Sequence, residues 1–430
     1  MIPIYKNKGD IQDCGNYRGI KLTSHTMKIW ERIIDRRLRE VVQISNEQFG
    51  FMPGRSTTDA IYALRLLMEK YREGQQELHC VFIDLEKAYD RVPREEVGNC
   101  LRQKGVTENY IRLIQDMYQG SSTQIRCTVG LSETFEVKVG VHQGSALSPF
   151  LFAIIMDCLT EEVRRESPWD MMFADDVVLC TEKRGEVERR LEEWTRALEQ
   201  QGMKVNRTKT EYLATGGGAM EEGSINLQAE PVKRVAKFKY LGSTVQEDGG
   251  ADQEVLRRIQ AGWNSWRTLT GVLCDKKVPT PVKGRLYKTM VRPAMLYGME
   301  AVAVTKRQEK QMEVAEMRML SFPMGLTRKD KVRNEVVRER MGVGELSGKL
   351  RETRMRWYGH VTRRDDEYVG KRVQRLRIGK RKRGRPKRRI RDCFNNDMEA
   401  SGLWETDAGD RGLWKRKIRT GDPIACGKSL

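Results

Sequence analysis

Two adjacent carboxylates interrupt an apolar segment in the middle of the chain. Asp175 and Asp176 lie within residues 173–179, whose other members are all apolar. Because strand interiors disfavour aspartate, the two acids most simply occupy the turn of a hairpin. A second short apolar segment, residues 81–83, also ends on an acid, Asp84. The sequence therefore predicts three carboxylates at the ends of neighbouring buried strands.

Carboxylates grouped in this way predict a bound cation. Three of them would repel one another unless positive charge lay between them. Mg²⁺ prefers hard oxygen ligands and is usually held by one or two carboxylates together with substrate phosphates. Two Mg²⁺ ions about 4 Å apart form the clamp that polymerases and nucleases use for in-line phosphoryl transfer, and Mn²⁺ is the alternative ion. The spacing alone does not distinguish a polymerase from a nuclease, and an ordinary hairpin turn is the simplest alternative.

Composition points to a polyanionic partner. The chain has 430 residues, with 79 Lys and Arg against 60 Asp and Glu, a formal net charge of +19. Such a charge favours nucleic acid, with a membrane surface as the second alternative. The longest apolar run, residues 150–156, is too short to cross a bilayer, and residues 1–8 lack a signal-peptide core. Nine scattered cysteines without C-x-x-C spacing argue against a zinc or disulfide framework. We therefore expect a protein of nucleus and cytoplasm, with no membrane partner.

Helical and strand patterns alternate in the first half of the chain. Apolar residues recur at helical spacing in residues 27–42, 59–71, 107–118 and 187–198, and Ser148-Pro149 marks the start of another helix. Strand patterns occupy residues 80–83, 125–141 and 171–179. Because no regular β-α-β repeat is present, this mixture predicts the α+β class. Beyond Gly250 strand patterns nearly vanish, and helices are predicted at 252–270, 280–297 and 306–321.

Three ordered motifs contain the predicted carboxylates and the helix start between them. They are FIDLEKAYD at 82–90, HQGSALSP at 142–149 and FADD at 173–176. Together they resemble motifs A, B and C of the reverse transcriptases of non-LTR (LINE-type) retrotransposons, and their details are most similar to the RTE/BovB branch. Further segments resemble the fingers, D and E motifs of that family: NYRGI at 16–20, QFGFMPGRS at 48–56, GMKVN at 202–206 with Lys209-Thr210, and FKYLG at 238–242.

The resemblance implies a right-hand polymerase fold of the α+β class. Residues 1–245 would form fingers and palm around an antiparallel sheet, 246–330 a helical thumb-like region, and 331–430 a basic nucleic-acid-binding region. The implied activity is RNA-directed DNA polymerase, which extends a primer 3′-hydroxyl with dNTPs by two-metal phosphoryl transfer. The implied partners are an RNA template, a DNA primer or target DNA, and dNTPs, and the oligomeric state is left open.

The resemblance also implies roles for individual residues. Asp84, Asp175 and Asp176 would be the metal-binding triad, and Lys209 would protonate pyrophosphate as general acid. The incoming nucleotide would be bound by Arg18 at its triphosphate, by Tyr89 against a ribose 2′-hydroxyl, and by Gln143 and Gly144. The primer end would be gripped by Phe238, Tyr240, Leu241 and Gly242. The structural alternatives are core packing for Tyr89, solvated surface charge for the basic residues and an ordinary strand for 238–242.

A basic segment dominates the C-terminal region. Residues 371–391 hold 13 Lys or Arg and no acid, and include KRGRPKR at 382–388. The RGRP core resembles an AT-hook, which enters the narrow minor groove of A·T tracts. We prefer the simpler interpretation as a basic arm or nuclear localisation signal, because relatives carry Gly-Arg-Pro here within their own pattern. Both interpretations place Arg383, Arg385, Lys387 and Arg388 on nucleic acid.

The front of the chain departs from the family pattern. Relatives have an apurinic-type endonuclease before the fingers, whereas Met1 stands almost at the first fingers motif. We therefore expect an N-terminally truncated form without the endonuclease. A catalytically idle retroelement remnant, which binds nucleic acid through a basic groove and tail, is the alternative to an active polymerase. An RNA-directed RNA polymerase is a further alternative.

Overall fold

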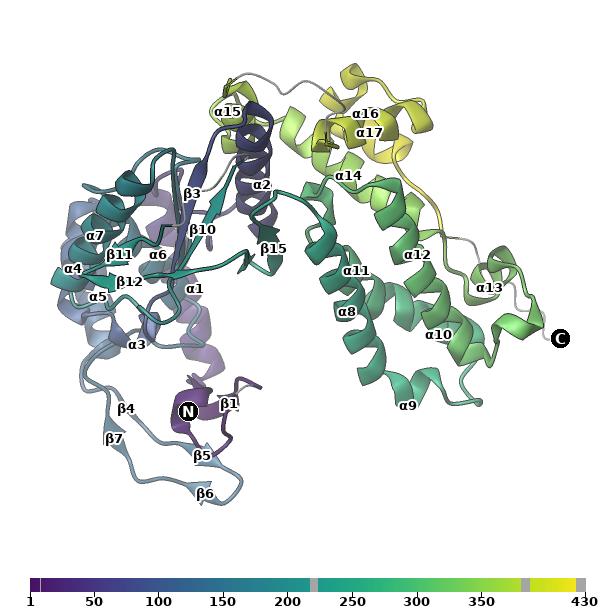
Figure 1. Cartoon of the computed structure of the whole chain (residues 1–430). Helices are drawn as coiled ribbons and strands as arrows, with labels where there is room; N and C mark the ends of the chain where they lie inside the picture. Colours follow the sequence, from purple (N-terminus) through teal and green to yellow (C-terminus); the bar gives the residue numbers. More distant parts are fainter. Residues whose placement is uncertain (8, 217–222, 380–386, 423–430) are drawn as a thin grey trace. The chain divides into compact units, whose positions relative to one another are not determined.

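The computed structural model describes residues 1–7, 9–216, 223–379 and 387–422, and the chain divides into two compact units (Figure 1). The first unit comprises Met1–Thr57, His79–Tyr212 and Glu221–Val235. The second comprises Thr58–Leu78, Leu213–Met220 and Ala236–Leu430.

A five-stranded sheet forms the centre of the first unit. Its strand order is β13 (Lys233–Arg234), β10 (Glu211–Thr215), β3 (Leu78–Ile83), β9 (Asp176–Thr181) and β8 (Asp170–Phe173), and β3 and β10 run side by side in Figure 1. All residues of β3 are buried, as its apolar sequence predicts. Strand β9 pairs antiparallel with both β3 and β8, so the two acid-bearing segments of the sequence are neighbours in one sheet, in which β10 and β13 pair parallel.

Helices complete the core of the first unit. They are α1 (His25–Val41), α3 (Ala88–Arg91), α4 (Arg94–Gln103), α5 (Glu108–Tyr118), α6 (Ser148–Leu159) and α7 (Arg184–Gln200). Helix α6 begins at Ser148-Pro149 as predicted, and because its sequence is apolar all round it is buried on nearly every side. Helix α1 is different, since it buries Ile34 and Leu38 but leaves Ile29 and Ile33 exposed.

Short hairpins make up the rest of this unit. They are β1 (Ile2–Tyr5) with β2 (Tyr17–Ile20), β4 (Ser122–Thr123) with β7 (Phe135–Glu136), β5 (Arg126–Cys127) with β6 (Gly130–Leu131), and β11 (Asn226–Leu227) with β12 (Glu230–Pro231). The strands predicted at 125–141 are therefore only two residues long. Val129 is 97% exposed and Leu131 65%, so no buried face specifies a longer ladder here.

The second unit is mainly helical. It contains the hairpin of β14 (Lys237–Tyr240) and β15 (Ser243–Gln246). Its helices are α2 (Thr57–Gly74), α8 (Asp252–Thr268), α9 (Thr270–Leu273), α10 (Thr280–Leu286), α11 (Arg292–Leu296), α12 (Lys306–Ser321), α13 (Asn334–Met341), α14 (Leu346–Thr362), α15 (Val369–Arg375), α16 (Ile390–Ser401) and α17 (Arg411–Lys417). Helices α8, α11 and α12 lie together in Figure 1. A π-helical segment, Tyr287–Val291, joins α10 to α11.

One apolar cluster stabilises much of the second unit. It includes Val255 and Trp266 of α8, Met312 of α12 and Leu346 of α14, with Trp263 packed against it. The two tryptophans of α8 thus serve the core, as the sequence indicates. The helices predicted at 252–270 and 306–321 are confirmed, and the helix predicted at 280–297 is observed with its π-helical interruption.

Two features of the described residues concern membrane-spanning helices and cysteine pairing. None of the helices in the described ranges is long and apolar enough to cross a membrane. The eight cysteines within those ranges are all free thiols, including Cys80 and Cys180, whose Sγ atoms lie 3.6 Å apart on paired strands.

Candidate active site

The register of the central sheet brings the predicted carboxylates together. Ile83 of β3 lies opposite Val177 of β9, so continuation of this antiparallel register puts Asp84 beside Asp176. Strands β8 and β9 are joined by Ala174 and Asp175, because Phe173 pairs with Asp176. Asp175 therefore occupies the predicted hairpin turn, whereas Asp176 is the first residue of the following strand.

The hairpin turn is held by a buried amide. Gln48 is fully buried, and its Oε1 accepts the backbone N–H of Ala174 at 3.0 Å and that of Gly50 at 2.9 Å. Ala174 has φ +56°, a left-handed conformation that costs a non-glycine residue free energy and here needs outside support. Gln48 provides this support, and it is held in place because its backbone forms a parallel bridge with Met172 of β8. Position 50 accommodates only glycine without a shift of the backbone, since a Cβ there would lie 2.4 Å from the Ala174 nitrogen.

A second backbone pairing brings Lys209 to Asp84. Leu85 and Val205 form an antiparallel bridge, and the N–H of Asn206 donates to the carbonyl of Asp84 at 2.7 Å. The chain then turns at 206–209, and Lys209 Nζ reaches Asp84 Oδ2 at 3.2 Å. Both side chains are partly exposed, so this ion pair can be broken at low cost.

The pKa values of two of the three carboxyl groups are raised. Burial and the charge of Asp84 raise the pKa of Asp175, opposed by a hydrogen bond to its own backbone and by the positive charges of Arg18 and Lys209. Partial burial, together with the charges of Asp175 and Asp84, raises the pKa of Asp176 to about 6, although part of this residue stays exposed. A cation between these groups would relieve both effects.

The donor set fits a hard divalent cation by its chemistry, because all three groups are carboxylates. Across the described ranges, however, no three His, Cys, Asp or Glu side chains gather closely enough to enclose an ion. Asp84 is instead paired with Lys209, which occupies the position of a counter-charge. Asp84 and Asp175 are the side chains that would hold an ion once Asp84 is released.

The predicted nucleotide-binding residues lie in the same unit. Arg18 is an exposed residue of β2 and is close enough to Asp175 to lower its pKa. Tyr89 is half-buried and stacks on Phe152 of α6, with ring centroids 4.6 Å apart and planes at 14°. Burial and the charge of Asp175 raise the pKa of the Tyr89 phenol above its usual range. Core packing, the structural alternative for Tyr89, is therefore part of its environment.

The loop before α6 is fixed from three sides. Gln143 Nε2 donates to Asp90 Oδ1 at 3.2 Å, and the Gln143 carbonyl accepts the N–H of Lys21 at 2.8 Å. Gly144 has φ +102°, and a Cβ there would lie 2.6 Å from the Lys21 carbonyl oxygen, so only glycine fits. Glu31, 1% exposed, accepts the N–H of Ala146 at 2.7 Å.

The predicted primer-grip residues belong to the second unit. Phe238 and Tyr240 are on β14, and Leu241 and Gly242 form its two-residue turn, both with positive φ. The Leu241 carbonyl accepts the hydroxyl of Tyr297 at 2.9 Å, and the Gly242 carbonyl accepts Arg258 Nη2 at 2.8 Å. Side chains of the helical region thus hold this turn in place.

The basic-tail residues divide into two groups. Arg383 and Arg385 lie outside the described residues. Lys387 is exposed, whereas Arg388 is half-buried and its Nε lies 3.1 Å from Cys393 Sγ. Much of the C-terminal region predicted as basic is helical, since α13 to α17 lie within 334–417.

Comparison with known proteins gives the family. A family model described as reverse transcriptase (RNA-dependent DNA polymerase) matches residues 4–245. The chain belongs to this family. Its members generally use divalent metal ions, and family membership together with the mixed helix and sheet architecture confirms the predicted right-hand polymerase, α+β class.

Relatives come from non-LTR retrotransposons. The chain is 27% identical over 323 residues to the Pol polyprotein of type-1 retrotransposable element R2 from Popillia japonica, covering 70% of this chain and 44% of that protein. It is 24% identical over 307 residues to a probable RNA-directed DNA polymerase from transposon BS of Drosophila melanogaster, covering 66% of this chain and 33% of that one. It thus spans less than half the length of these relatives. Apo telomerase from Candida tropicalis aligns with a TM-score of 0.39 at 13% identity, over 78% of this chain and 58% of that one.

Two supporting residues were not singled out from the sequence. Gln48 supports the Asp175 turn, and Glu31 supports the loop before α6. A third residue, Asp90, has the structural role that motif A suggests for it and orients Gln143. Gln48 lies within the matched QFGFMPGRS segment and Asp90 within FIDLEKAYD, so the motifs contained them without indicating their contacts. Glu31 gave a weaker signal: it is an acid on the buried side of an otherwise amphipathic helix.

Proposed function

We propose that this chain is an RNA-directed DNA polymerase of a non-LTR retroelement, from the RTE/BovB branch. The observation that carries the proposal is the β3–β9 register, which puts Asp84 beside Asp176 and next to the turn residue Asp175. Family membership supplies the reaction class, a nucleotidyl transfer. The substrates would be dNTPs, an RNA template and a DNA primer or target DNA.

Asp84 and Asp175 would hold two Mg²⁺ ions, or Mn²⁺ in their place, with Asp176 beside them. When bound, the ions would supply Lewis-acid activation of the primer 3′-hydroxyl and charge stabilisation at the leaving pyrophosphate. Lys209 lies 3.2 Å from Asp84 and would deliver a proton to that leaving group. Its contact with Asp84 supports this role, because it shows that the ammonium reaches the carboxylates.

The nucleotide would be bound by residues that surround the carboxylates. Arg18 would pair with triphosphate oxygens, for which a guanidinium has the matching geometry. Tyr89, stiffened by stacking on Phe152, would exclude a ribose 2′-hydroxyl. Gln143 and Gly144 would contact the nucleotide from the loop before α6, where the missing Cβ of Gly144 lets backbone approach it.

The second unit would bind the primer and product duplex. Phe238, Tyr240, Leu241 and Gly242 would grip the primer end, with residues 246–330 acting as thumb and 331–430 as an additional nucleic-acid-binding region. Lys387 and Arg388, with Arg383 and Arg385, would contact phosphates without reading bases. A nuclear and cytoplasmic location follows from this substrate.

The decisive experiment is primer extension on an RNA template with Mg²⁺ and dNTPs. We expect extension by the wild type, and a loss of roughly 10²–10³-fold or more in Asp175→Asn and Asp84→Asn. The matched control is Asp116→Asn, the same change at an exposed position of α5, which should leave extension unchanged. Equal extension by the wild type and Asp175→Asn would overturn the proposal. Salt-sensitive duplex binding without extension under any divalent metal would support the idle remnant instead.

A further inference from the structure

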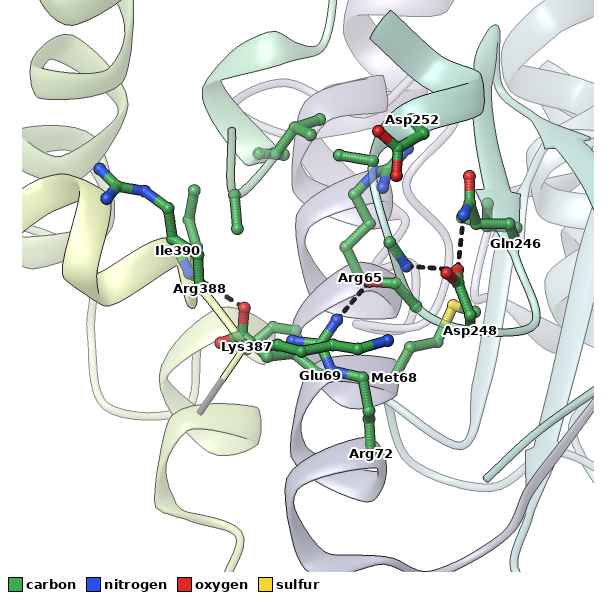
Figure 2. A pocket seen from close by; sticks show the side chains of 18 of the residues that line it. Arg65, Met68, Glu69, Arg72, Gln246, Asp248, Asp252, Lys387, Arg388 and Ile390 are labelled. Atoms are coloured by element: carbon green, nitrogen blue, oxygen red, sulfur yellow. Dashed lines mark hydrogen bonds between the residues drawn. The ribbon is translucent and has the colours of Figure 1, made fainter. Parts of the chain in front are cut away.

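A cavity of about 270 Å³ lies within the second unit, separate from the carboxylates (Figure 2). Its walls are formed by α2, by the turn after β15, by residues 301–308 and by the segment 387–390 that leads into α16. This cavity is smaller than the pockets that usually enclose drug-sized ligands, but it can hold one small polar group.

Basic residues outnumber acidic ones in the lining. The basic residues are Arg65, Arg72, Lys387 and Arg388, and the acidic ones are Glu69, Asp248 and Asp252. Each acid already accepts hydrogen bonds from the chain. Glu69 accepts the N–H of Ile390 at 2.9 Å, Asp248 accepts that of Gly250 at 2.7 Å, and Asp252 accepts Gln308 Nε2 at 2.8 Å.

The two arginines of α2 retain unused donors. Arg65 Nη2 donates to Ser243 Oγ at 2.9 Å, and Arg72 Nη1 donates to the Gly249 carbonyl at 2.5 Å. Within the described part of the chain, the buried Arg65 Nε and Arg72 Nη2 atoms have no hydrogen-bond acceptor. A guanidinium cannot lose its proton to escape this cost, so an acceptor that enters the cavity and reaches these N–H groups would be stabilised by them.

The side chains of the other two basic residues, Lys387 and Arg388, point in different directions. Figure 2 shows the Lys387 side chain extending across the cavity toward Asp248, while Arg388 points away from it. Arg388 instead contacts Cys393, so it contributes charge but no donor to the cavity. The positive side chains that face the cavity are therefore Arg65, Arg72 and Lys387.

We propose that this cavity binds one backbone phosphate of a nucleic-acid strand. A phosphate supplies several acceptor oxygens and negative charge, which match the unused guanidinium donors and the Lys387 ammonium, whereas the three acids of the lining already accept hydrogen bonds from the chain. One wall is formed by residues 387–390, which follow directly in the sequence on a strongly basic run, so along the chain the cavity adjoins a segment suited to bind a nucleic-acid strand. The volume admits a phosphate but no base pair, so the site would anchor a strand without reading its sequence.

This inference rests on the proposed function in taking nucleic acid as the ligand, and it is tested without catalysis. The protein is Asp175→Asn in EDTA, and the probe is a short fluorescent single-stranded RNA titrated at several salt concentrations. Arg72→Gln and Lys387→Gln should each weaken binding several-fold at low salt. Each should also reduce the slope of log K against log[salt] by about 0.7, the value of one single-strand phosphate contact.

The matched control is Arg196→Gln, which removes the same charge from an exposed position of α7 in the first unit, a helix with no proposed contact to nucleic acid. It should leave the salt slope unchanged. As a second readout, inorganic phosphate should raise the unfolding temperature of the wild type and not that of Arg72→Gln. If Arg72→Gln misfolds, Lys387→Gln, whose side chain is exposed, decides the question.

Equal slopes in Arg72→Gln, Lys387→Gln and Arg196→Gln would overturn the phosphate site, as would a wild-type unfolding temperature that does not respond to phosphate. Failure of primer extension would leave these binding results intact. The two proposals can therefore fail separately.

Discussion

Gln48 is the residue on which the geometry of the candidate active site most directly depends. Its buried amide oxygen accepts two backbone N–H groups, one of them from Ala174 in the turn that carries Asp175. Ala174 is held at φ +56°, where a non-glycine residue is strained. Without the amide, the turn would lose a buried acceptor and relax, and the Asp175 carboxylate would move with it.

Gln48→Ala should therefore lower the turnover of primer extension by about tenfold, equivalent to about 1.4 kcal/mol of lost transition-state stabilisation. Affinity for primer and template should change by less than about twofold, because Gln48 is buried and cannot contact them directly. Steady-state and single-turnover extension would separate the two quantities. Gln103→Ala, at an exposed position of α4, is the matched control and should behave as wild type. A Gln48→Ala variant with normal turnover and weakened binding would contradict the positioning role.

The residue scale also shows what the sequence can predict. The acids at strand ends were found because a residue type conflicts with its apolar surroundings, which is a local signal. The contacts of Gln48 with Ala174 and of Glu31 with Ala146 join positions more than 100 residues apart, so no local pattern reveals them. The side chain of Lys209 reaches Asp84 only through the Leu85–Val205 bridge, which depends on the folded register.

At the scale of elements, the β14–β15 hairpin is fastened to α8 by a buried ion pair. Arg258 Nε lies 3.1 Å from Glu254 Oε1, and both side chains are at most 7% exposed. Glu254 accepts the N–H of Thr244 at 2.5 Å, and Arg258 donates to the Gly242 carbonyl. The pair therefore connects the helix to the turn and to β15 of the hairpin predicted to grip the primer.

Arg258→Met should destabilise the second unit by about 2 kcal/mol, because it leaves Glu254 as a buried charge. The cost is below that of an isolated buried charge because Arg65 lies near enough to Glu254 to compensate in part. Urea unfolding would measure it. Arg258→Met combined with Glu254→Gln should cost less than the sum of the single changes, since neither buried charge then remains. Additive costs would show that the two side chains do not act as a pair.

A second element contact joins α2 to the start of α16 through Glu69. Burial is the main cause that raises the pKa of Glu69 to about 7, with Glu73 adding to it, while the Ile390 N–H and the charges of Arg72 and Arg389 oppose it. Lys70 also faces this carboxyl. The native carboxyl keeps its proton up to about pH 7, whereas the unfolded one loses it near pH 4.5. The native state therefore binds more protons in this window, and its stability falls as the pH rises through it.

Glu69→Gln should remove that loss, because glutamine does not ionise and its Oε1 can still accept the Ile390 N–H. The variant should match wild type near pH 5 and exceed it by about 2 kcal/mol near pH 8. Thermal unfolding at both pH values would measure the difference. The control is Glu399→Gln, an exposed acid of α16, which should show no such pH dependence. A Glu69→Gln variant that is less stable than wild type at pH 8 would show that Glu69 acts as a charged partner.

Element types were more predictable than their faces. The helices beyond residue 250 were predicted from apolar residues at helical spacing. That spacing indicates a helix with one buried side, and helices are what the structure has there. In α1 the pattern includes Ile29 and Ile33, which the folded chain leaves 59% and 49% exposed. Periodicity reports that a helix is amphipathic, but the packing partners decide which apolar residues become buried.

At the scale of the whole molecule, the positive charge is concentrated in the C-terminal region, whereas the apolar contacts of the second unit are shared between that region and the residues before it. The basic residues concentrate toward the C-terminus, but the same region contributes Leu346 and Leu350 to a cluster shared with Val255 and Met312. Arg354 donates to Glu309 at 3.0 Å and to Asp397, so polar contacts also cross position 330. The C-terminal region is therefore structural as well as basic, whatever it binds.

Removal of the residues after Asp330 should consequently destabilise the second unit and not merely weaken nucleic-acid binding. The deletion strips apolar partners from α8 and α12 and leaves Asp59, which accepts the Tyr368 hydroxyl at 2.7 Å, without that donor. We expect the unfolding temperature to fall by roughly 10 °C or more, as a loss of about 3–5 kcal/mol implies for a unit of this size.

The control keeps the chain intact and neutralises two exposed basic residues, Arg377→Gln with Lys387→Gln. That variant should bind RNA more weakly and unfold at the wild-type temperature. A truncated chain that unfolds cooperatively at the wild-type temperature would show that the region after residue 330 is an independent tail, whose only contribution is charge.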